Sequence, residues 1–61
     1  MYIVYFMENK NVILCQYRKQ IPNLHEKIRM KGRMGTITNI QEREGFKIYV
    51  EVLFEKRKRR N

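Results

Sequence analysis

Residues 46–54 read Phe-Lys-Ile-Tyr-Val-Glu-Val-Leu-Phe, and this stretch is the clearest structural signal in the chain. Its apolar residues occupy every second position, which is the period of a β-strand that turns one face toward a core. The positions between them carry mostly polar side chains, which suit a face exposed to solvent. We therefore predict a strand over residues 46–55 whose core-facing set runs from Phe46 to Phe54.

The residues before this strand predict the arm with which it forms a hairpin. Residues 27–31 alternate basic and apolar side chains, so Ile28 and Met30 are expected on one face and the three cations on the other. Gly32 and Gly35 follow, and a glycine inside a strand pattern marks a bulge or a sharp bend. Farther on, Gly45 closes a polar connection and is the expected positive-φ residue.

Two runs near the start of the chain predict a first hairpin. Residues 2–7 are apolar on both faces, which favours a strand that is covered on both sides or lies at a subunit contact. A four-residue polar break separates them from a second strand-like run over residues 12–17. Beyond it, Asn23 and Glu26 fit the cap and the third position of a helix, so at most one short helical turn is expected there.

Short strands with glycine bends and no long helix predict an all-β fold, a small barrel or a rolled antiparallel sheet of about five strands. A chain of 61 residues makes one domain at most. We assign residues 1–55 to a single small β-domain and residues 56–61 to a basic, disordered tail. The strands are expected over residues 2–7, 12–17, 27–32, 34–40 and 46–55.

The charge of the chain is concentrated in two blocks. Lys and Arg number 14 against 6 acidic residues, which gives a net charge of +8. Residues 18–36 hold six of the cations and one glutamate, and residues 56–61 hold five more cations. Two basic blocks that share a surface would attract a polyanion or an acidic protein face. A high net charge also keeps a small protein dispersed without any such partner.

The chain offers little for catalysis or for metal binding. Cys15 is the one cysteine and His25 the one histidine, so an intrachain disulfide and a Cys/His metal cluster are excluded. Cys15 stands in an apolar run and is predicted to be a small buried side chain. No paired nucleophile and base, and no paired carboxylates, are apparent. We expect a protein that is not an enzyme, with no catalytic residue, no metal and no cofactor.

The hydropathy of the chain also bears on its compartment. No apolar run approaches the roughly 20 residues that a membrane-spanning helix needs, so we expect no membrane partner. The opening residues lack the basic start and the cleavage site of a signal peptide. Together with the single thiol, this predicts a reducing, cytoplasmic location.

Two segments resemble the KOW-type, SH3-like barrel family: residues 27–40, Lys-Ile-Arg-Met-Lys-Gly-Arg-Met-Gly-Thr-Ile-Thr-Asn-Ile, and residues 49–52, Tyr-Val-Glu-Val. The shared pattern is a basic alternating strand, a glycine-basic-x-glycine bend, a β-branched strand, a loop and a closing Val-Glu-Val strand. The resemblance covers about residues 27–53. It implies an SH3-like barrel that contacts RNA, DNA or protein, as in ribosomal proteins and transcription elongation factors.

The basic arm is the predicted nucleic-acid-binding site. Cations at alternate strand positions stand about 6.6 Å apart on one face, which matches a phosphate track. Tyrosines beside them would add stacking on bases of any sequence. The alternatives are a solvated outer face whose long side chains cover apolar neighbours, or an acidic protein surface as the partner. The predicted site comprises Arg18, Lys19, Lys27, Arg29, Lys31 and Arg33, with Tyr17 and Tyr49 as stacking platforms.

The end of the chain adds five consecutive cations: Lys56, Arg57, Lys58, Arg59 and Arg60. Such a run predicts a nucleic-acid arm or an address signal, and the alternative is a disordered, solubilising end. The predicted function is a non-catalytic module that binds nucleic acid or a ribonucleoprotein surface. The alternative is a protein-interaction or structural module that assembles through its apolar first hairpin, as a homo-oligomer or with another protein.

Overall fold

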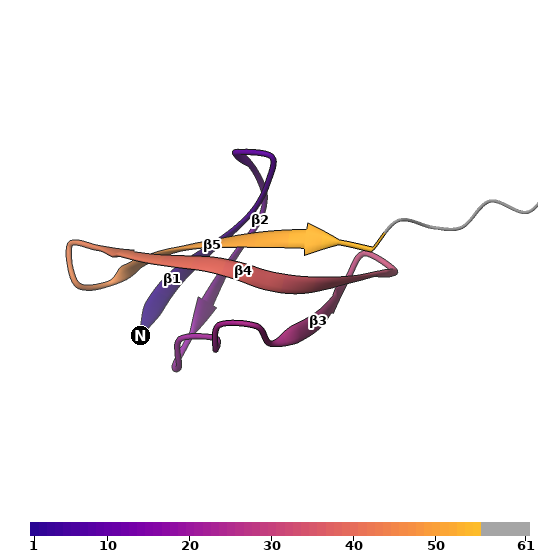
Figure 1. Ribbon diagram of the computed structural model, residues 1–61. Helices are drawn as coiled ribbons and strands as arrows, with labels where there is room; N and C mark the ends of the chain where they lie inside the picture. The colour runs from indigo at the N-terminus through magenta and orange to yellow at the C-terminus, as the bar shows by residue number, and fades with distance from the viewer. Residues whose placement is uncertain (56–61) are drawn as a thin grey trace, which may run out of the picture.

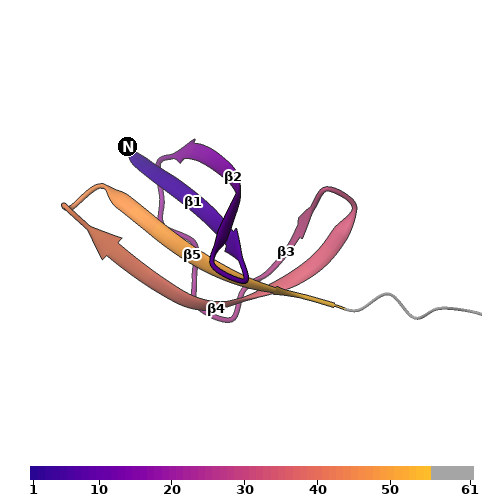
Figure 2. The same cartoon turned by 90° about the horizontal axis from the view of Figure 1, so that it is seen from above.

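A computed structural model describes residues 1–55 as one five-stranded sheet. Its strands are β1 (Tyr2–Glu8), β2 (Asn11–Arg18), β3 (Lys27–Met30), β4 (Arg33–Arg43) and β5 (Lys47–Phe54). They lie in the order β2-β1-β5-β4-β3, and the sheet curls into a half-barrel (Figures 1 and 2). The described residues contain only strands, turns and loops, which confirms the predicted all-β fold. No helix that could cross a membrane occurs among these residues.

One parallel strand pair joins two antiparallel units. β1 and β2 form the first hairpin, and β3, β4 and β5 form an antiparallel meander. β1 and β5 run parallel, with Val4 beside Ile48 and Phe6 beside Val50. Alternation within each strand predicts which face is buried, but it does not say which distant strand lies next to it. The sheet is therefore mixed, with this single parallel pair among its described strands.

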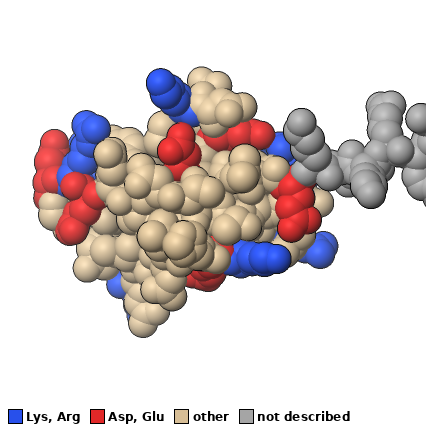
Figure 3. All heavy atoms as spheres, viewed as in Figure 1, with Lys and Arg blue, Asp and Glu red and all other residues tan. Residues whose placement is uncertain are grey.

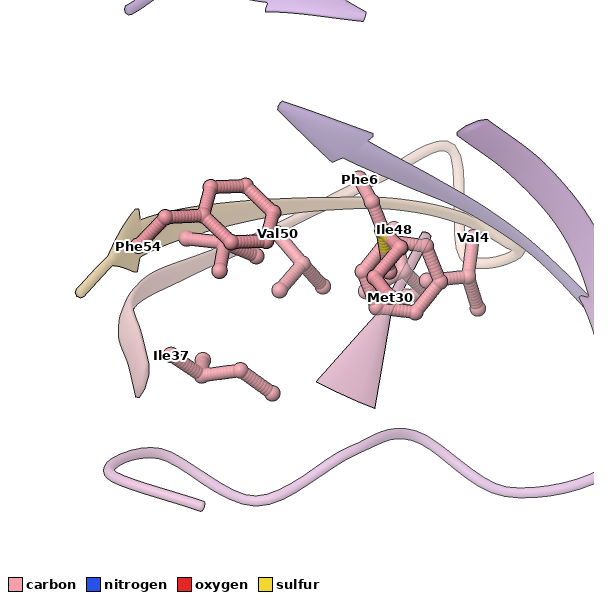
Figure 4. Packing of buried hydrophobic residues seen from close by; sticks show 8 residues of the cluster. Val4, Phe6, Met30, Ile37, Ile48, Val50 and Phe54 are labelled. Carbon is pink, nitrogen blue, oxygen red and sulfur yellow. The ribbon is translucent and has the colours of Figure 1, made fainter. Parts of the chain in front are cut away.

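The core fills the concave side of the curled sheet (Figure 4). Fully burying an aliphatic or phenyl side chain stabilises the fold by about 1.5–3 kcal/mol. Phe46 was expected in this set, but it precedes the first residue of β5 and is 42% exposed. The alternation of β5 is otherwise confirmed. The buried residues are Val4, Phe6, Met30, Ile37, Ile48, Val50, Val52 and Phe54.

Each hairpin turns through two consecutive residues with positive φ. This is the pattern of a type I′ turn, whose twist matches that of the flanking strands. The positive φ predicted for Gly45 is confirmed. The strand predicted over residues 27–32 ends at Met30, because Lys31 already belongs to the turn. The three pairs are Asn9 and Lys10 (51° and 69°), Lys31 and Gly32 (54° and 78°), and Glu44 and Gly45 (57° and 76°).

The connection between β2 and β3 makes a turn without a helix. The main-chain N–H of Asn23 donates to Glu26 Oε1 at 3.0 Å, as a helix cap would require. His25, however, has a φ of 71°, and the N–H of Glu26 returns to the carbonyl of Asn23 at 3.1 Å. The chain therefore reverses direction here, and Ile37 of β4 donates its N–H to the Glu26 carbonyl at 2.9 Å.

Candidate nucleic-acid interface

β2 and β3 are the two edge strands of the half-barrel (Figure 2). Residues of both strands line a groove of about 360 Å³. At one end of this groove, Lys31 Nζ donates to the carbonyl of Ile13 at 3.2 Å. At the other end, residues 19–26 connect the two strands. Because a lysine side chain bridges the gap, the edges stand farther apart than the roughly 4.8 Å of directly paired strands.

Cations line this groove above an apolar floor. Phe6 and Met30 are buried, so the floor is continuous with the core. The guanidinium carbon of Arg18 lies 6.0 Å from the centroid of the Phe6 ring. The eight lining residues include no carboxylate, so a bound anion would meet only positive charge on the walls. They are Arg18, Arg29 and Lys31, together with Phe6, Leu14, Gln16, Ile28 and Met30.

The predicted alignment of three cations along one strand holds for two of them. Lys27 and Arg29 are exposed and lie on the same face of β3, opposite Ile28 and Met30. Lys31 leaves the strand at the turn and directs its ammonium group toward β2. The straight phosphate track is therefore interrupted after Arg29. Arg29 and Lys31 are, with Arg18, the three cations among the residues that line the groove.

Arg33 is engaged within the protein. Its guanidinium donates to both carboxylate oxygens of Glu8, at 3.0 and 3.4 Å. It also lies 4.2 Å from the centroid of the Phe54 ring. These contacts, which we call the latch, hold the β3–β4 turn against the first hairpin. The hollow of about 940 Å³ that Arg33 lines also contains Glu8 and Glu55, so it suits an anion less well than the groove does.

The two predicted stacking tyrosines lie on the convex face, which is the face of the sheet opposite the core. Tyr17 is 74% exposed. Tyr49 is half-buried and stacks on Tyr5, with the ring centroids 4.8 Å apart and the planes at 15°. Arg43 lies 5.3 Å from the Tyr49 centroid. Sequence reasoning missed Tyr5 because the parallel pairing of β1 and β5 brings the two rings together.

Charge is dispersed over the rest of the surface. On the face shown in Figure 3, basic and acidic side chains stand mainly around the outline, and uncharged surface fills much of the middle. Lys19 is exposed directly after β2. The tail cations, residues 56–60, lie outside the described residues. The groove is thus a place where three of the predicted cations line one surface and where no carboxylate is among the lining residues.

The remaining candidate groups give no second site. Cys15 is exposed, and the prediction that it is buried is wrong because β2 is an edge strand covered on one side. Cys15 lies beside Tyr5 on the convex face. Within residues 1–55, no three His, Cys, Asp or Glu side chains come close enough to hold a metal ion.

The geometry defines a small open β-barrel-like module with a cationic groove between its edges. Comparisons of the chain with protein-family models, with curated proteins and with solved structures found no match. The resemblance to the KOW-type family therefore stays a prediction.

Proposed function

We propose that this chain is a non-catalytic module that binds RNA or DNA through the phosphate backbone, alone or on a ribonucleoprotein surface. The observation that carries the proposal is the groove, which Arg18, Arg29 and Lys31 line without any carboxylate. Cations that neutralise phosphates release condensed counterions, and this release drives binding. The KOW-type resemblance supports the same class of ligand. The single thiol supports a reducing, cytoplasmic location.

The proposal is tested by titrating labelled single-stranded RNA and DNA with the protein at ~50 and ~200 mM salt. Three phosphate contacts in the groove give a salt slope of about −2, so affinity should fall about 20-fold between the two salt concentrations. Arg29→Gln should reduce the slope by about 0.7 and weaken binding to both nucleic acids.

Lys10→Gln is the matched control. It removes one exposed cation from the β1–β2 turn, outside the groove, and should leave the affinity nearly unchanged. Absence of binding at the lower salt concentration would end the proposal. Equal losses from Arg29→Gln and Lys10→Gln would show that binding reflects net charge and that the groove is not its site.

The convex face supports a second function, which is assembly with another protein or with a second copy of the chain. Tyr17, Val12 and Leu53 are 74%, 52% and 67% exposed, and the strand register places them on this face. Exposed apolar patches mark interaction sites. Sedimentation velocity over a range of concentrations should show association that Tyr17→Ser weakens. A monomer at every concentration would rule out the homo-oligomer.

A further inference from the structure

We infer that the groove accepts one single strand of nucleic acid in preference to a duplex. This inference rests on the proposed function and names its ligand more narrowly. Arg18 and Lys31 are among the residues that line this groove between two strand edges. Arg29 lines its rim from the outer face of β3, opposite Ile28 and Met30. A duplex carries its phosphates on the outside of a stiff double helix and would touch only the rims of such a channel. A single strand is flexible enough to lie within it.

The walls of the groove are themselves hydrogen-bonding surfaces. In the described sheet, β2 is paired only with β1 and β3 only with β4. Each edge therefore presents main-chain N–H and C=O groups that no neighbouring strand uses. Bases of a single strand have free Watson–Crick edges that such groups can pair with, whereas a duplex has already paired those edges. The edges thus offer contacts that favour a single strand.

The floor of the groove favours unstacked bases. Leu14 and Ile28 are half-buried and continue into the buried Phe6 and Met30. A base that lies on this floor removes apolar surface from water, which is favourable. The bases of a duplex stay stacked on one another and cannot do this. Cationic walls and an apolar floor match a strand whose phosphates and bases can contact the protein separately.

Lys31 forms the closure at one end of the channel. Its ammonium group now donates to the neutral carbonyl of Ile13 in an exposed position. A phosphate oxygen would accept a charge-assisted hydrogen bond, which is the stronger kind. We therefore expect the Lys31 ammonium group to leave the Ile13 carbonyl and to donate to a phosphate oxygen when a single strand of nucleic acid enters the groove.

The first test compares an oligonucleotide with the duplex of the same sequence, by fluorescence anisotropy at one salt concentration. The single strand should bind about tenfold more tightly or better. Arg29→Gln and Lys31→Gln should weaken single-strand binding more than duplex binding, and Lys10→Gln should change neither. Equal affinities, or tighter duplex binding, would overturn the inference and leave the proposed function standing. Absence of binding to both ligands would overturn the proposed function as well.

The second test locates the ligand by NMR, from the amide chemical shifts of the labelled protein. The largest changes are expected at residues 14–18 of β2, at residues 28–30 of β3 and at Lys31 in the turn that follows, with little change at the Glu44–Gly45 turn. Chemical-shift changes concentrated at Tyr5, Tyr17 and Tyr49 would place the bound nucleic acid on the convex face and overturn the inference. An acidic peptide of alternating Glu and Val is the competitor. If the peptide changes the chemical shifts of the groove amides at a lower concentration than the oligonucleotide does, the groove binds an extended protein segment and the inference is overturned.

Discussion

At Gly35, side chains of β5 pack closely against the backbone of β4. A Cβ atom added there would stand 2.5 Å from Val52 Cγ1, 3.1 Å from Phe54 Cδ1 and 3.3 Å from the Leu53 carbonyl oxygen. The sequence pattern predicts a bend at this glycine. Gly35 is instead a regular strand residue, paired with Ile28 and Phe54, and the irregularity of β4 falls beyond it, after Ile37. Because Gly35 has no side chain, the core residues Val52 and Phe54 can occupy the space beside it.

Gly35→Ala should therefore destabilise the fold by about 1–3 kcal/mol, the usual cost of overpacking a core. Urea unfolding followed by circular dichroism measures the change. Gln41→Ala, an exposed substitution on the same strand, should cost far less. An alanine variant as stable as the native protein would mean that Val52 and Phe54 have room to shift.

Lys10 is the opposite case to Gly35: it carries a side chain at a position whose backbone conformation suits glycine better. Its φ of 69° lies in the left-handed region, which disfavours any residue with a Cβ. Lys10→Gly creates Asn-Gly, the preferred pair of a type I′ turn, and should stabilise the protein by about 0.5–1 kcal/mol. Lys10→Ala keeps the strain and should not stabilise. If both variants gain equally in thermal unfolding, loss of the charge is responsible and the backbone argument fails.

At the scale of elements, the latch holds the β3–β4 turn against the first hairpin. The Arg33 and Glu8 side chains are 47% and 30% exposed, so solvent screens the ion pair and limits its contribution to about 0.2–1 kcal/mol. The stacking of Arg33 on Phe54 adds about 0.5–1 kcal/mol. The arginine should therefore matter more than its carboxylate partner.

We expect Arg33→Ala to reduce the free energy of unfolding by about 1–2 kcal/mol, and Glu8→Gln by less than about 1 kcal/mol. Adding both changes to one chain completes a double-mutant cycle that isolates the ion pair. High salt should shrink the effect of Glu8→Gln and leave much of the effect of Arg33→Ala. Equal losses from the two single variants would mean that the Phe54 contact contributes nothing.

The elements also show how far the sequence predicts the structure. Alternation identifies the buried residues of β5 from Ile48 to Phe54, because burial on one face of a strand is a local pattern. The end of β3 was harder to predict. Lys31 continues the alternation, and a lysine carries no sequence mark of a positive φ, whereas Gly45 does. A positive φ at a residue such as Lys31 therefore cannot be predicted from alternation and glycine positions alone.

At the scale of the whole molecule, the groove depends on contacts between distant segments. The parallel pairing of β1 with β5 joins the two units, and the curl of the sheet then brings β2 and β3 to opposite sides of one channel. The sequence predicts the basic residues of positions 18–36 as one block. It does not predict that Arg18 and Arg29 share a groove while Arg33 reaches Glu8, because the partner of a long side chain is set by non-local neighbours.

In the proposed binding, the net charge of the whole chain would act together with the groove, and the two contributions can be separated. The five tail cations at residues 56–60 supply most of the net charge of +8. A positive field speeds encounter with any polyanion, single-stranded or duplex, and salt weakens it. Replacing all five with Gln should therefore lower affinity for both ligands by a similar factor at ~50 mM salt, with a smaller loss at ~200 mM.

The ratio of single-strand to duplex affinity is the informative measurement for this variant, because the proposed groove site distinguishes the two ligands and a general positive field does not. The tail variant should keep the ratio of the native chain, and Arg29→Gln, tested alongside, should lower it. If the tail variant loses the single-strand preference while Arg29→Gln retains it, recognition resides in the tail. The half-barrel would then be the scaffold that carries the tail, and its groove would need a different occupant.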